Sequence, residues 1–526
     1  MTAVIRNIML PVNFDFSEKS LISAAAGELS INKNLISSAK LVRKSVDARH
    51  KNNIKFCVSI AVTGENLPNN KNLSPYSENE YEFFTGMLSA PLRPVVVGFG
   101  PCGIFAALTL SKAGLKPIVL ERGRAVEERK SDVEKFFRDG VLNPESNIQF
   151  GEGGAGTFSD GKLNTGTKDI RNRAVLREFF NNGADESILY DAKPHVGTDV
   201  LPKIVSGIRH EIEQLGGEVI FGAKFLSFTR DDNGISSVSY EKDGEKHSLE
   251  TNDLILAVGH SARDTFRYLS SSGVELTAKP FSLGVRIEHK QADVNSEIYG
   301  KFAKSGMLGA ADYKLFTHLP SGRGVYTFCM CPGGDVVNAS SEIGGLVTNG
   351  MSNSKRDGEN ANSALLVSVN PSDASGDDPL RLMYLQERIE KNAYAFGDGK
   401  PPVQLVGDFL ESRASTCAKK IKPTIKPEVK YGDLGTIFPE FVTSSLKEAI
   451  PLLARKLHFF SDNDAVLTAP ETRSSSPVRI MRDDTFSATF NGLYPAGEGA
   501  GYAGGIMSSA VDGIRVAEAV IKKYKV

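Results

Sequence analysis

The sequence predicts an α/β fold built on a parallel sheet that is flanked by helices. An apolar strand at 95–97 runs into the turn GFGPCG and a helix-compatible segment, and a second strand, 118–120, then ends on Glu121. A further glycine-rich turn, GEGAGYAGG, stands near the other end of the chain at 497–505. Strand, glycine turn, helix and strand in this order indicate a βαβ unit, whose two strands lie parallel in one sheet.

The glycines of the first turn have the GxGxxG spacing of a dinucleotide site. Gly98 permits a tight turn, Gly100 lets the backbone approach a pyrophosphate, and Gly103 lets the helix pack closely on the sheet. The helix then offers unpaired N–H groups and a positive dipole end to the phosphates. Glu121 follows at about the usual offset for an acid that binds a ribose hydroxyl, and its charge would repel a 2′-phosphate. We therefore expect FAD or NAD here. The neighbours expected to contact it are Pro101, Cys102 and Arg122.

The second glycine turn favours FAD over NAD. Glu498 stands among glycines after a strand end, where it can reach a ribityl hydroxyl, and the following helix can face the flavin pyrimidine, where reduction builds negative charge. A turn with a packing helix explains the helix but leaves these glycines without a purpose. An apolar strand at 254–258, ending on Gly259, returns the chain to the same sheet between the two turns. The expected cofactor contacts here are Gly497, Glu498, Gly504, Gly505, Ile506 and Gly259.

A third glycine-dense segment, GEGGAGTFSDGKLNT at 151–165, follows the first βαβ unit. Its glycines allow backbone amides to approach a ligand closely, so we predict that this loop lies beneath the flavin ring. A plain surface loop is the alternative. The residues of this loop expected to contact the cofactor are Gly154, Gly156, Ser159, Asp160, Lys162 and Leu163.

Together these motifs resemble the two-dinucleotide-binding-fold flavoprotein superfamily. Longer segments resemble its bacterial family of uncharacterised FAD-dependent dehydrogenases, or NAD(P)/FAD-dependent oxidoreductases, with a small amino-terminal domain. These are NIQFGEGGAGTFSDGKLNTGTK (147–168), FSLGVRIEH (281–289), YTFCMCPGG (326–334), ETRSSSPVRI (471–480) and YPAGEGAGYAGGIMSSAVDGI (494–514). The resemblance implies a Rossmann-like FAD-binding domain but no particular substrate. It assigns FAD roles to Gly98, Gly100, Gly103, Glu121, Arg122, Gly497 and Glu498.

Three domains are expected along the chain. Residues 1–89 form a small α+β domain, with strands at 5–11 and 54–63 and helices at 17–29 and 34–49. Residues 90–265 and 456–526 form the Rossmann-like FAD-binding domain. Residues 266–455 are richer in β-like runs and in Gly/Ser/Asn loops, and they form an inserted α+β substrate domain that covers the flavin.

Composition narrows the classes of partner and compartment. The net charge of -1 gives no general attraction to nucleic acid or to anionic membranes. No apolar run reaches the roughly 18 residues of a spanning helix, so we expect no membrane insertion. The 5 cysteines are an odd number in a long chain and indicate reduced thiols, which favours a cytoplasmic location. Composition does not define the oligomeric state.

Several residues are candidates for catalysis. The two thiols of Cys329 and Cys331 would point to opposite faces of a strand, so a disulfide between them would be strained; buried packing is one interpretation and a thiol facing the flavin is the other. His260 could transfer protons, and Arg286 and Arg473 could bind an anion, although structural ion pairs explain them equally well. HExxH, paired CxxC and GxSxG motifs are absent, so no metal site is expected.

The sequence therefore predicts an FAD-dependent oxidoreductase, a dehydrogenase that passes hydride between a small organic substrate and flavin N5. A second GxGxxG is absent, so NAD(P)H as electron donor would bind transiently. A different hypothesis is an FAD-containing protein that binds or modifies RNA through the basic residues Arg43, Lys44, Arg49 and Lys51. A flavin monooxygenase and a structural or redox-sensing flavoprotein are also compatible with these motifs.

Overall fold

A parallel sheet lies at the centre of the computed structural model, which describes residues 2–65, 67–68, 72–77 and 80–525. The strands of this sheet follow the order β23-β11-β5-β6-β7, and every neighbouring pair is parallel. The chain is therefore a mixed α/β protein, as expected. The strands are β5 (Val95–Val97), β6 (Ile118–Glu121), β7 (Glu218–Phe221), β11 (Leu254–Leu256) and β23 (Leu493–Pro495).

Alternate residues of the central strands bury opposite faces of the sheet. Val96, Val119 and Ile255 pack on one face against helices, and Val95, Leu120 and Leu254 pack on the other against a three-stranded antiparallel sheet and α6. The helices of the first face are α2 (Pro101–Lys112), α4 (Arg171–Asn181), α5 (Leu201–Gln214) and α11 (Ile506–Tyr524). The elements on the second face of the sheet are β8 (Lys224–Asp231), β9 (Gly234–Lys242), β10 (Glu245–Glu250) and α6 (Arg263–Ser271).

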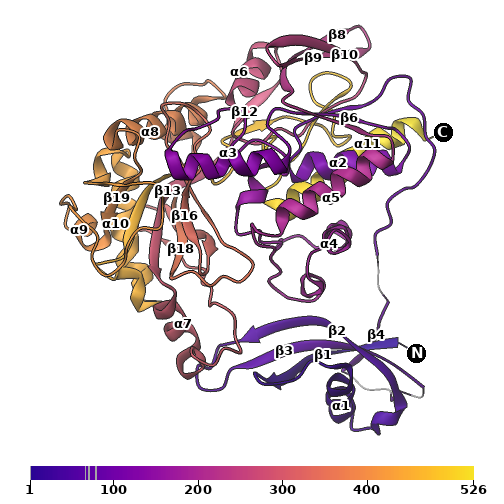
Figure 1. Cartoon of the computed structure of the whole chain (residues 1–526), viewed down its shortest axis with the longest axis vertical. Helices are drawn as coiled ribbons and strands as arrows, with labels where there is room; N and C mark the ends of the chain where they lie inside the picture. The colour runs from indigo at the N-terminus through magenta and orange to yellow at the C-terminus, as the bar shows by residue number, and fades with distance from the viewer. Residues whose placement is uncertain (1, 66, 69–71, 78–79, 526) are drawn as a thin grey trace.

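Helix α2, which follows the first glycine turn, lies directly beside α11, which follows the second (Figure 1). The two ends of the dinucleotide pattern are therefore neighbours in space. Between β6 and α4 the chain forms α3 (Val126–Asp139) and the glycine-dense loop, part of which is a short 3₁₀-helix, Gly154–Phe158.

The chain between β11 and β23 builds a second, seven-stranded sheet in the order β14-β15-β18-β13-β21-β19-β20. Its last strand in sequence, β21, lies beyond residue 455, so the sheet extends past the expected domain boundary. Its strands are β13 (Phe281–Lys290), β14 (Phe316–His318), β15 (Gly324–Cys331), β18 (Asn360–Val369), β19 (Pro402–Leu405), β20 (Lys430–Tyr431) and β21 (Val466–Glu471). Its helices are α7 (Gln291–Tyr299), α8 (Arg381–Gly397), α9 (Val406–Leu410) and α10 (Glu440–Ala454).

Two short antiparallel pairs complete this half of the molecule. The first, β12 (Leu276–Ala278) with β22 (Val478–Ile480), packs among the residues on the second face of the central sheet. The second, β16 (Asp335–Asn338) with β17 (Thr348–Met351), lies beside β18 and β13.

The amino-terminal residues form a separate antiparallel sheet in the order β2-β3-β1-β4, packed on α1 (Glu18–Leu29). The helix predicted at 34–49 was wrong, because this segment is strand β2. Its backbone pairs with β3 along nearly its whole length, a non-local interaction that overrides weak local helical preference. The strands are β1 (Thr2–Pro11), β2 (Ile36–Asp47), β3 (Lys55–Gly64) and β4 (Leu73–Pro75).

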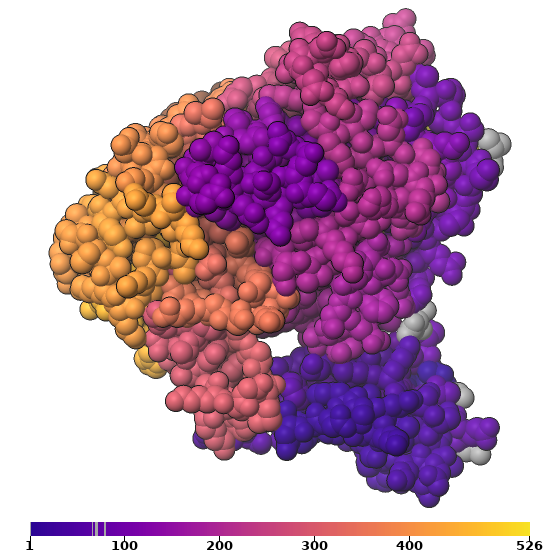
Figure 2. All heavy atoms as spheres, viewed as in Figure 1, coloured from indigo at the N-terminus to yellow at the C-terminus, as the bar shows by residue number. Residues whose placement is uncertain are grey.

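This amino-terminal sheet packs against both larger parts of the molecule, as the indigo spheres at the lower edge of Figure 2 show. The N–H of Lys44 donates to the carbonyl of Tyr190 at 2.8 Å, and the N–H of Ala192 donates back to the carbonyl of Lys44 at 2.8 Å. On the other side, Ile54 is 2% exposed and belongs to the core beneath the seven-stranded sheet. The sheet therefore bridges the two parts.

Most of the predicted basic cluster is engaged within the chain. The Nζ atom of Lys44 lies 3.6 Å from Asp191 Oδ1 and over the ring of Phe16. Arg49 pairs with Asp47 at 2.5 Å, and Lys51 Nζ lies 3.5 Å from Glu297 Oε1. These contacts reduce the positive charge that this surface could offer to a nucleic acid.

None of the helices in the described part of the chain has the length and apolarity that crossing a bilayer requires.

Because Ile54 is buried in the core beneath the seven-stranded sheet, we expect it to contribute to the free energy of unfolding of the whole chain. Ile54→Ala should lower the free energy of unfolding by about 2–4 kcal/mol, because it opens a cavity between the amino-terminal sheet and the larger core. Ile343→Ala is the matched control, since Ile343 is 80% exposed, and should change stability by less than about 0.5 kcal/mol. Chemical denaturation measures both; equal effects would contradict this docking.

Candidate functional site

A cavity of about 360 Å³ opens at the carboxyl ends of the parallel strands. This is where ligands bind in open α/β sheets. Residues from both glycine turns, from the glycine-dense loop and from the seven-stranded sheet line it. The predicted residues on its wall are Gly98, Gly100, Pro101, Cys102, Glu121, Arg122, Gly154, Gly156, Ser159, Asp160, Lys162, Gly259, His260, Cys329, Arg473, Glu498, Gly504, Gly505 and Ile506.

The first turn is shaped so that only glycine fits at two positions. Gly98 has φ +98°, and a Cβ there would lie 2.6 Å from the carbonyl oxygen of Ala257. A Cβ on Gly103 would lie 1.8 Å from the carbonyl oxygen of Gly98. Gly100 precedes α2 and no side chain caps this helix end, so the backbone N–H groups of its first turn are open toward the cavity.

Glu121 holds this turn together through its carboxylate, which is 5% exposed. Oε2 accepts from the N–H of Phe99 at 2.7 Å, and Oε1 accepts from the N–H groups of Gly123 and Gly151 at 2.9 Å each. A single acid thus joins the glycine turn, the end of β6 and the start of the glycine-dense loop. Arg122 beside it forms ion pairs with Glu145 and Asp264 and stacks on the ring of Phe150.

The second turn places Glu498 on the same cavity. Its Oε2 accepts from the N–H of Gly505 at 3.1 Å, immediately before α11. The Nδ1 atom of His260 lies 3.7 Å from Glu498 Oε1, whereas its buried Nε2 has no hydrogen-bond partner among the described residues. Burial, reinforced by Arg473 and Arg263, lowers the pKa of His260 to about 3, so its ring is neutral at pH 7. Burial raises the pKa of Glu498.

The glycine-dense loop is fixed through Asp160, which is 1% exposed. Its carboxylate accepts from Ser352 at 2.6 Å and from Arg356 at 2.5 Å, and it lies 2.7 Å from Lys162 Nζ. Burial acts to raise the pKa of Asp160, but Lys162 and Arg356 outweigh it and lower that pKa. Asp160 therefore fastens this loop to the segment that follows β17.

Arg286 does not line the cavity but holds three groups that do. Its guanidinium is fully buried and bonds to both carboxylate oxygens of Glu471, at 2.7 and 3.2 Å. It also donates to the carbonyl of Cys329 at 2.9 Å and to Oδ1 of Asn349 at 2.8 Å, and a further bond to Asn362 occupies its last donor. Since all five N–H donors are used, Arg286 orients its neighbours and has no donor left for a ligand.

The two cysteines of the CxC motif differ in their surroundings. Cys329 has φ +44° at a bulge in β15 and lines the cavity. Cys331 is fully buried, its thiol donates to the carbonyl of Cys329 at 3.2 Å, and burial raises its pKa to about 12. Cys331 is thus an unreactive thiol at neutral pH. In the described structure neither cysteine forms a disulfide.

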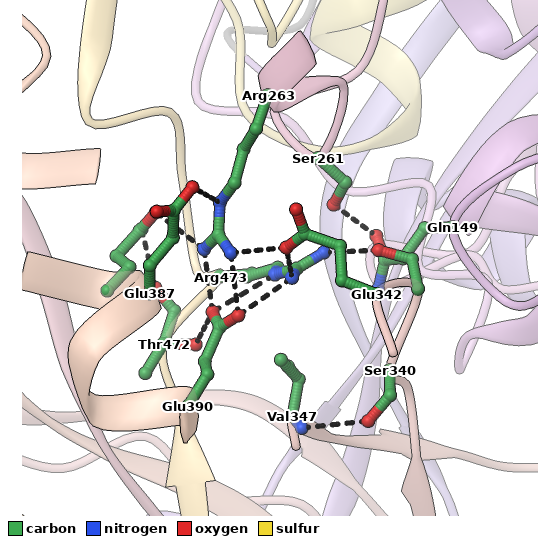
Figure 3. A network of polar contacts seen from close by, with 12 residues as sticks. Gln149, Ser261, Arg263, Ser340, Glu342, Val347, Glu387, Glu390, Thr472 and Arg473 are labelled. Carbon is green, nitrogen blue, oxygen red and sulfur yellow. Dashed lines mark hydrogen bonds and ion pairs between the residues drawn. The ribbon is translucent and has the colours of Figure 1, made fainter. Parts of the chain in front are cut away.

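A buried ionic network ties Arg473 in place and joins the two larger parts of the molecule (Figure 3). The carboxylate of Glu390, on α8, accepts two bonds of 2.8 Å from Arg263, on α6, and bonds of 3.1 and 2.8 Å from Arg473. Burial acts to raise the pKa of Glu390, but the two guanidinium groups outweigh it and hold that pKa well below its usual range. Glu342 accepts from both arginines at the more exposed end of the network.

Four further predicted residues lie behind the wall of the cavity. Gly103 and Gly497 pack against neighbouring backbone and Cys102, while Leu163 and Cys331 belong to apolar cores. Sequence reasoning missed several residues that do line it. The principal ones are Gln149, Phe150, Phe225, Thr265, Phe328, Asn349, Glu471 and Ser474. Asn349 and Glu471 are single residues on antiparallel strands, where no local motif marks them.

A protein of Clostridium beijerinckii, described as an uncharacterized protein, is 46% identical to this chain over 537 residues, which cover 100% of the chain and 99% of that protein. The chain belongs to the same family as that protein. Residues 280–474 match the family described as "FAD-dependent protein, C-terminal domain-like". Residues 2–63 match a domain of unknown function, DUF8436.

Distant similarity to solved structures extends over most of the chain. The flavin-dependent brominase Bmp2 is 13% identical, covers 82% of this chain and 79% of its own, and gives a TM-score of 0.37. A geranylgeranyl bacteriochlorophyll reductase-like protein from Thermoplasma acidophilum is 13% identical. The match covers 83% of this chain and 79% of that protein's chain, with a TM-score of 0.37. A flavoprotein/dehydrogenase from Cytophaga hutchinsonii is 12% identical. The match covers 83% of this chain and 80% of that protein's chain, with a TM-score of 0.36. At these values the similarities indicate no function for this chain.

The network around Glu390 predicts a pH-dependent contribution to stability. Glu390→Gln should lower the free energy of unfolding by about 3–5 kcal/mol at pH 7, because it leaves two buried guanidinium groups without their shared anion. Since the pKa of Glu390 is lowered in the folded state, its contribution is complete above about pH 4.3 and is lost as the pH falls further.

Denaturation of the wild type and of Glu390→Gln from pH 7 to pH 3 measures this effect, with the exposed Glu448→Gln as control. The difference between the wild type and Glu390→Gln should shrink below about pH 4. A constant difference across this range would contradict the ion-pair assignment.

Proposed function

We propose that this chain, as a member of that family, is an FAD-dependent oxidoreductase, specifically a dehydrogenase acting on a small organic substrate. The observation that carries the proposal is the convergence of Glu121 and Glu498, each from its own glycine-rich turn, on one cavity. The family match of residues 280–474 to an FAD-dependent protein supports it.

The residues of the cavity suit FAD. The uncapped first turn of α2 behind Gly100 offers N–H groups to a pyrophosphate, and the bare backbone at Gly98 and Gly100 permits close approach. In this proposal Glu121 binds a ribose hydroxyl of FAD and Glu498 binds a ribityl hydroxyl. His260 also lines the cavity, and its buried Nε2 has no hydrogen-bond partner among the described residues.

FAD supplies the hydride chemistry when it is bound. The chain itself encloses the reaction and orients the reactants. The seven-stranded sheet contributes Phe328, Cys329 and Glu471 to the wall of the cavity. His260 is neutral at pH 7 and can accept or donate a hydrogen bond without adding charge. The Glu390 network binds the guanidinium of Arg473, a residue that also lines the cavity.

We propose the division into an amino-terminal domain, a Rossmann-like FAD-binding domain and an inserted substrate domain as the frame for this activity. The intramolecular pairing of Lys44, Arg49 and Lys51 favours the oxidoreductase over the RNA-binding hypothesis. NADH or NADPH is a transient electron donor in this proposal.

The test is the visible spectrum of the purified protein and its bleaching under anaerobic conditions by NADH or by NADPH. A flavin band that one of the two donors removes is the expected result. A protein that neither carries nor takes up FAD would contradict the proposal, and one that binds FAD but is reduced by no donor would favour a structural or sensing role.

Glu121→Gln should weaken FAD binding at least about tenfold. The amide keeps one acceptor oxygen, but its NH₂ group cannot accept from a peptide N–H, so at least one of the three bonds to the carboxylate is lost. A lost hydrogen bond to a charged group is worth about 1.5–3 kcal/mol. Fluorescence titration of the apoprotein with FAD measures the affinity. Glu128→Gln is the control, since the Glu128 side chain is 68% exposed; an equal change in both variants would contradict the role of Glu121.

A further inference from the structure

We call the part of the cavity that is lined by residues from outside the two glycine turns its second end; this part is rich in hydrogen-bond donors. Its wall comes from the seven-stranded sheet, from β17 and from the end of the glycine-dense loop. The residues that matter here are Lys162, Asn164, Cys329, Asn349 and Glu471.

The amide of Asn349 is fixed with its NH₂ group free. Its Oδ1 accepts from Arg286 Nη2 at 2.8 Å and from the N–H of Gly350 at 2.7 Å. Two donors on this atom identify it as the oxygen and fix the orientation of the amide. Nδ2 forms no hydrogen bond within the described part of the chain, so its two N–H donors are available to a ligand.

Lys162 supplies a cation beside this amide. Its ammonium donates to the carbonyl of Met330 and pairs with Asp160, which leaves one of its three N–H donors unused. Burial acts to lower the pKa of Lys162, but the pKa is raised overall, with the charge of Asp160 and the hydrogen bond to it among the causes, so the group is charged at pH 7.

The positive charge at this end is not cancelled. Asp160 is shared between Lys162 and Arg356, so one carboxylate faces two cations. Glu471 also lines the cavity, but both of its oxygens are bound by Arg286. These groups leave a surplus of one positive charge.

Lys162 and Asn349 are linked through consecutive peptide groups of β15. The carbonyl of Cys329 accepts from Arg286, which orients Asn349, and the next carbonyl, that of Met330, accepts from Lys162. The two carbonyls belong to adjacent residues on the bulge of β15, whose Cα atoms are about 3.8 Å apart. A Cβ on Gly350 would lie 2.5 Å from Arg286 Nη1, so the backbone next to Asn349 is also packed tightly on this guanidinium.

We infer that this end of the cavity binds a carboxylate, and that the substrate is therefore an organic acid. A planar amide NH₂ and one ammonium N–H match the two oxygens of a carboxylate, and the surplus charge favours an anion. This inference rests on the proposed function, since it names the substrate class for the same cavity. Lys162 and Asn349 bind the acid, and Arg286 acts as a positioning residue.

Isothermal titration calorimetry of the FAD-loaded protein with benzoate tests this, with benzamide as the neutral probe of the same shape and inorganic phosphate as a second anion. Benzoate should bind saturably, at least tenfold more tightly than either of the others. Lys162→Met removes the cation, and Asn349→Asp replaces the free NH₂ by an oxygen while keeping the acceptor for Arg286. Each should weaken benzoate binding at least tenfold, whereas the exposed Lys304→Met should not change it.

Three results would overturn the inference: no saturable benzoate binding, equal binding of benzamide or tighter binding of phosphate, or unchanged benzoate affinity in Lys162→Met and Asn349→Asp. The flavin absorbance and the unfolding temperature of each variant, recorded on the same samples, show whether it is folded and loaded. If the wild type takes up no FAD, the proposed function fails. The same titration of the unloaded protein then still reports whether the donor pair binds benzoate.

Discussion

The candidate site depends on one buried carboxylate. Glu121 accepts three peptide N–H groups, from Phe99, Gly123 and Gly151, which belong to three separate segments of the chain. A buried N–H group without an acceptor is costly, so this carboxylate determines how the segments meet. The hydrogen bond from the N–H of Phe99 to Glu121 fixes the turn around Gly98. The turn can therefore be tight without side chains of its own that would fill the cavity.

The second half of the site is organised by buried arginines. Arg286 spends all its donors on Glu471, Asn349, Asn362 and the backbone of β15, and Glu390 draws Arg263 and Arg473 together across two parts of the molecule. Removal of one partner from such a cluster leaves a buried charge, so each cluster forms as a unit. The seven-stranded sheet is thereby fixed against the parallel sheet, and the cavity between them has a defined shape.

The glycine turns were predictable because their chemistry is local: a strand, a tight turn and a helix leave their mark within about thirty residues. The strand β2 was not, since its pairing with β3 is a non-local property. Arg286 was predicted as an anion-binding residue, but only the fold reveals that its donors are already occupied. Asn349 and Glu471 reach the cavity through the register of the antiparallel strands, which no single sequence motif encodes.

The most direct test of the central claim is a crystal structure of the protein grown with FAD. Continuous density for one dinucleotide should run from Glu121, past the first turn of α2, to Glu498 and the start of α11. Density for the nucleotide at another place, or a well-ordered cavity that remains without it at saturating FAD, would contradict the claim that the two glycine-and-acid turns form a single binding site.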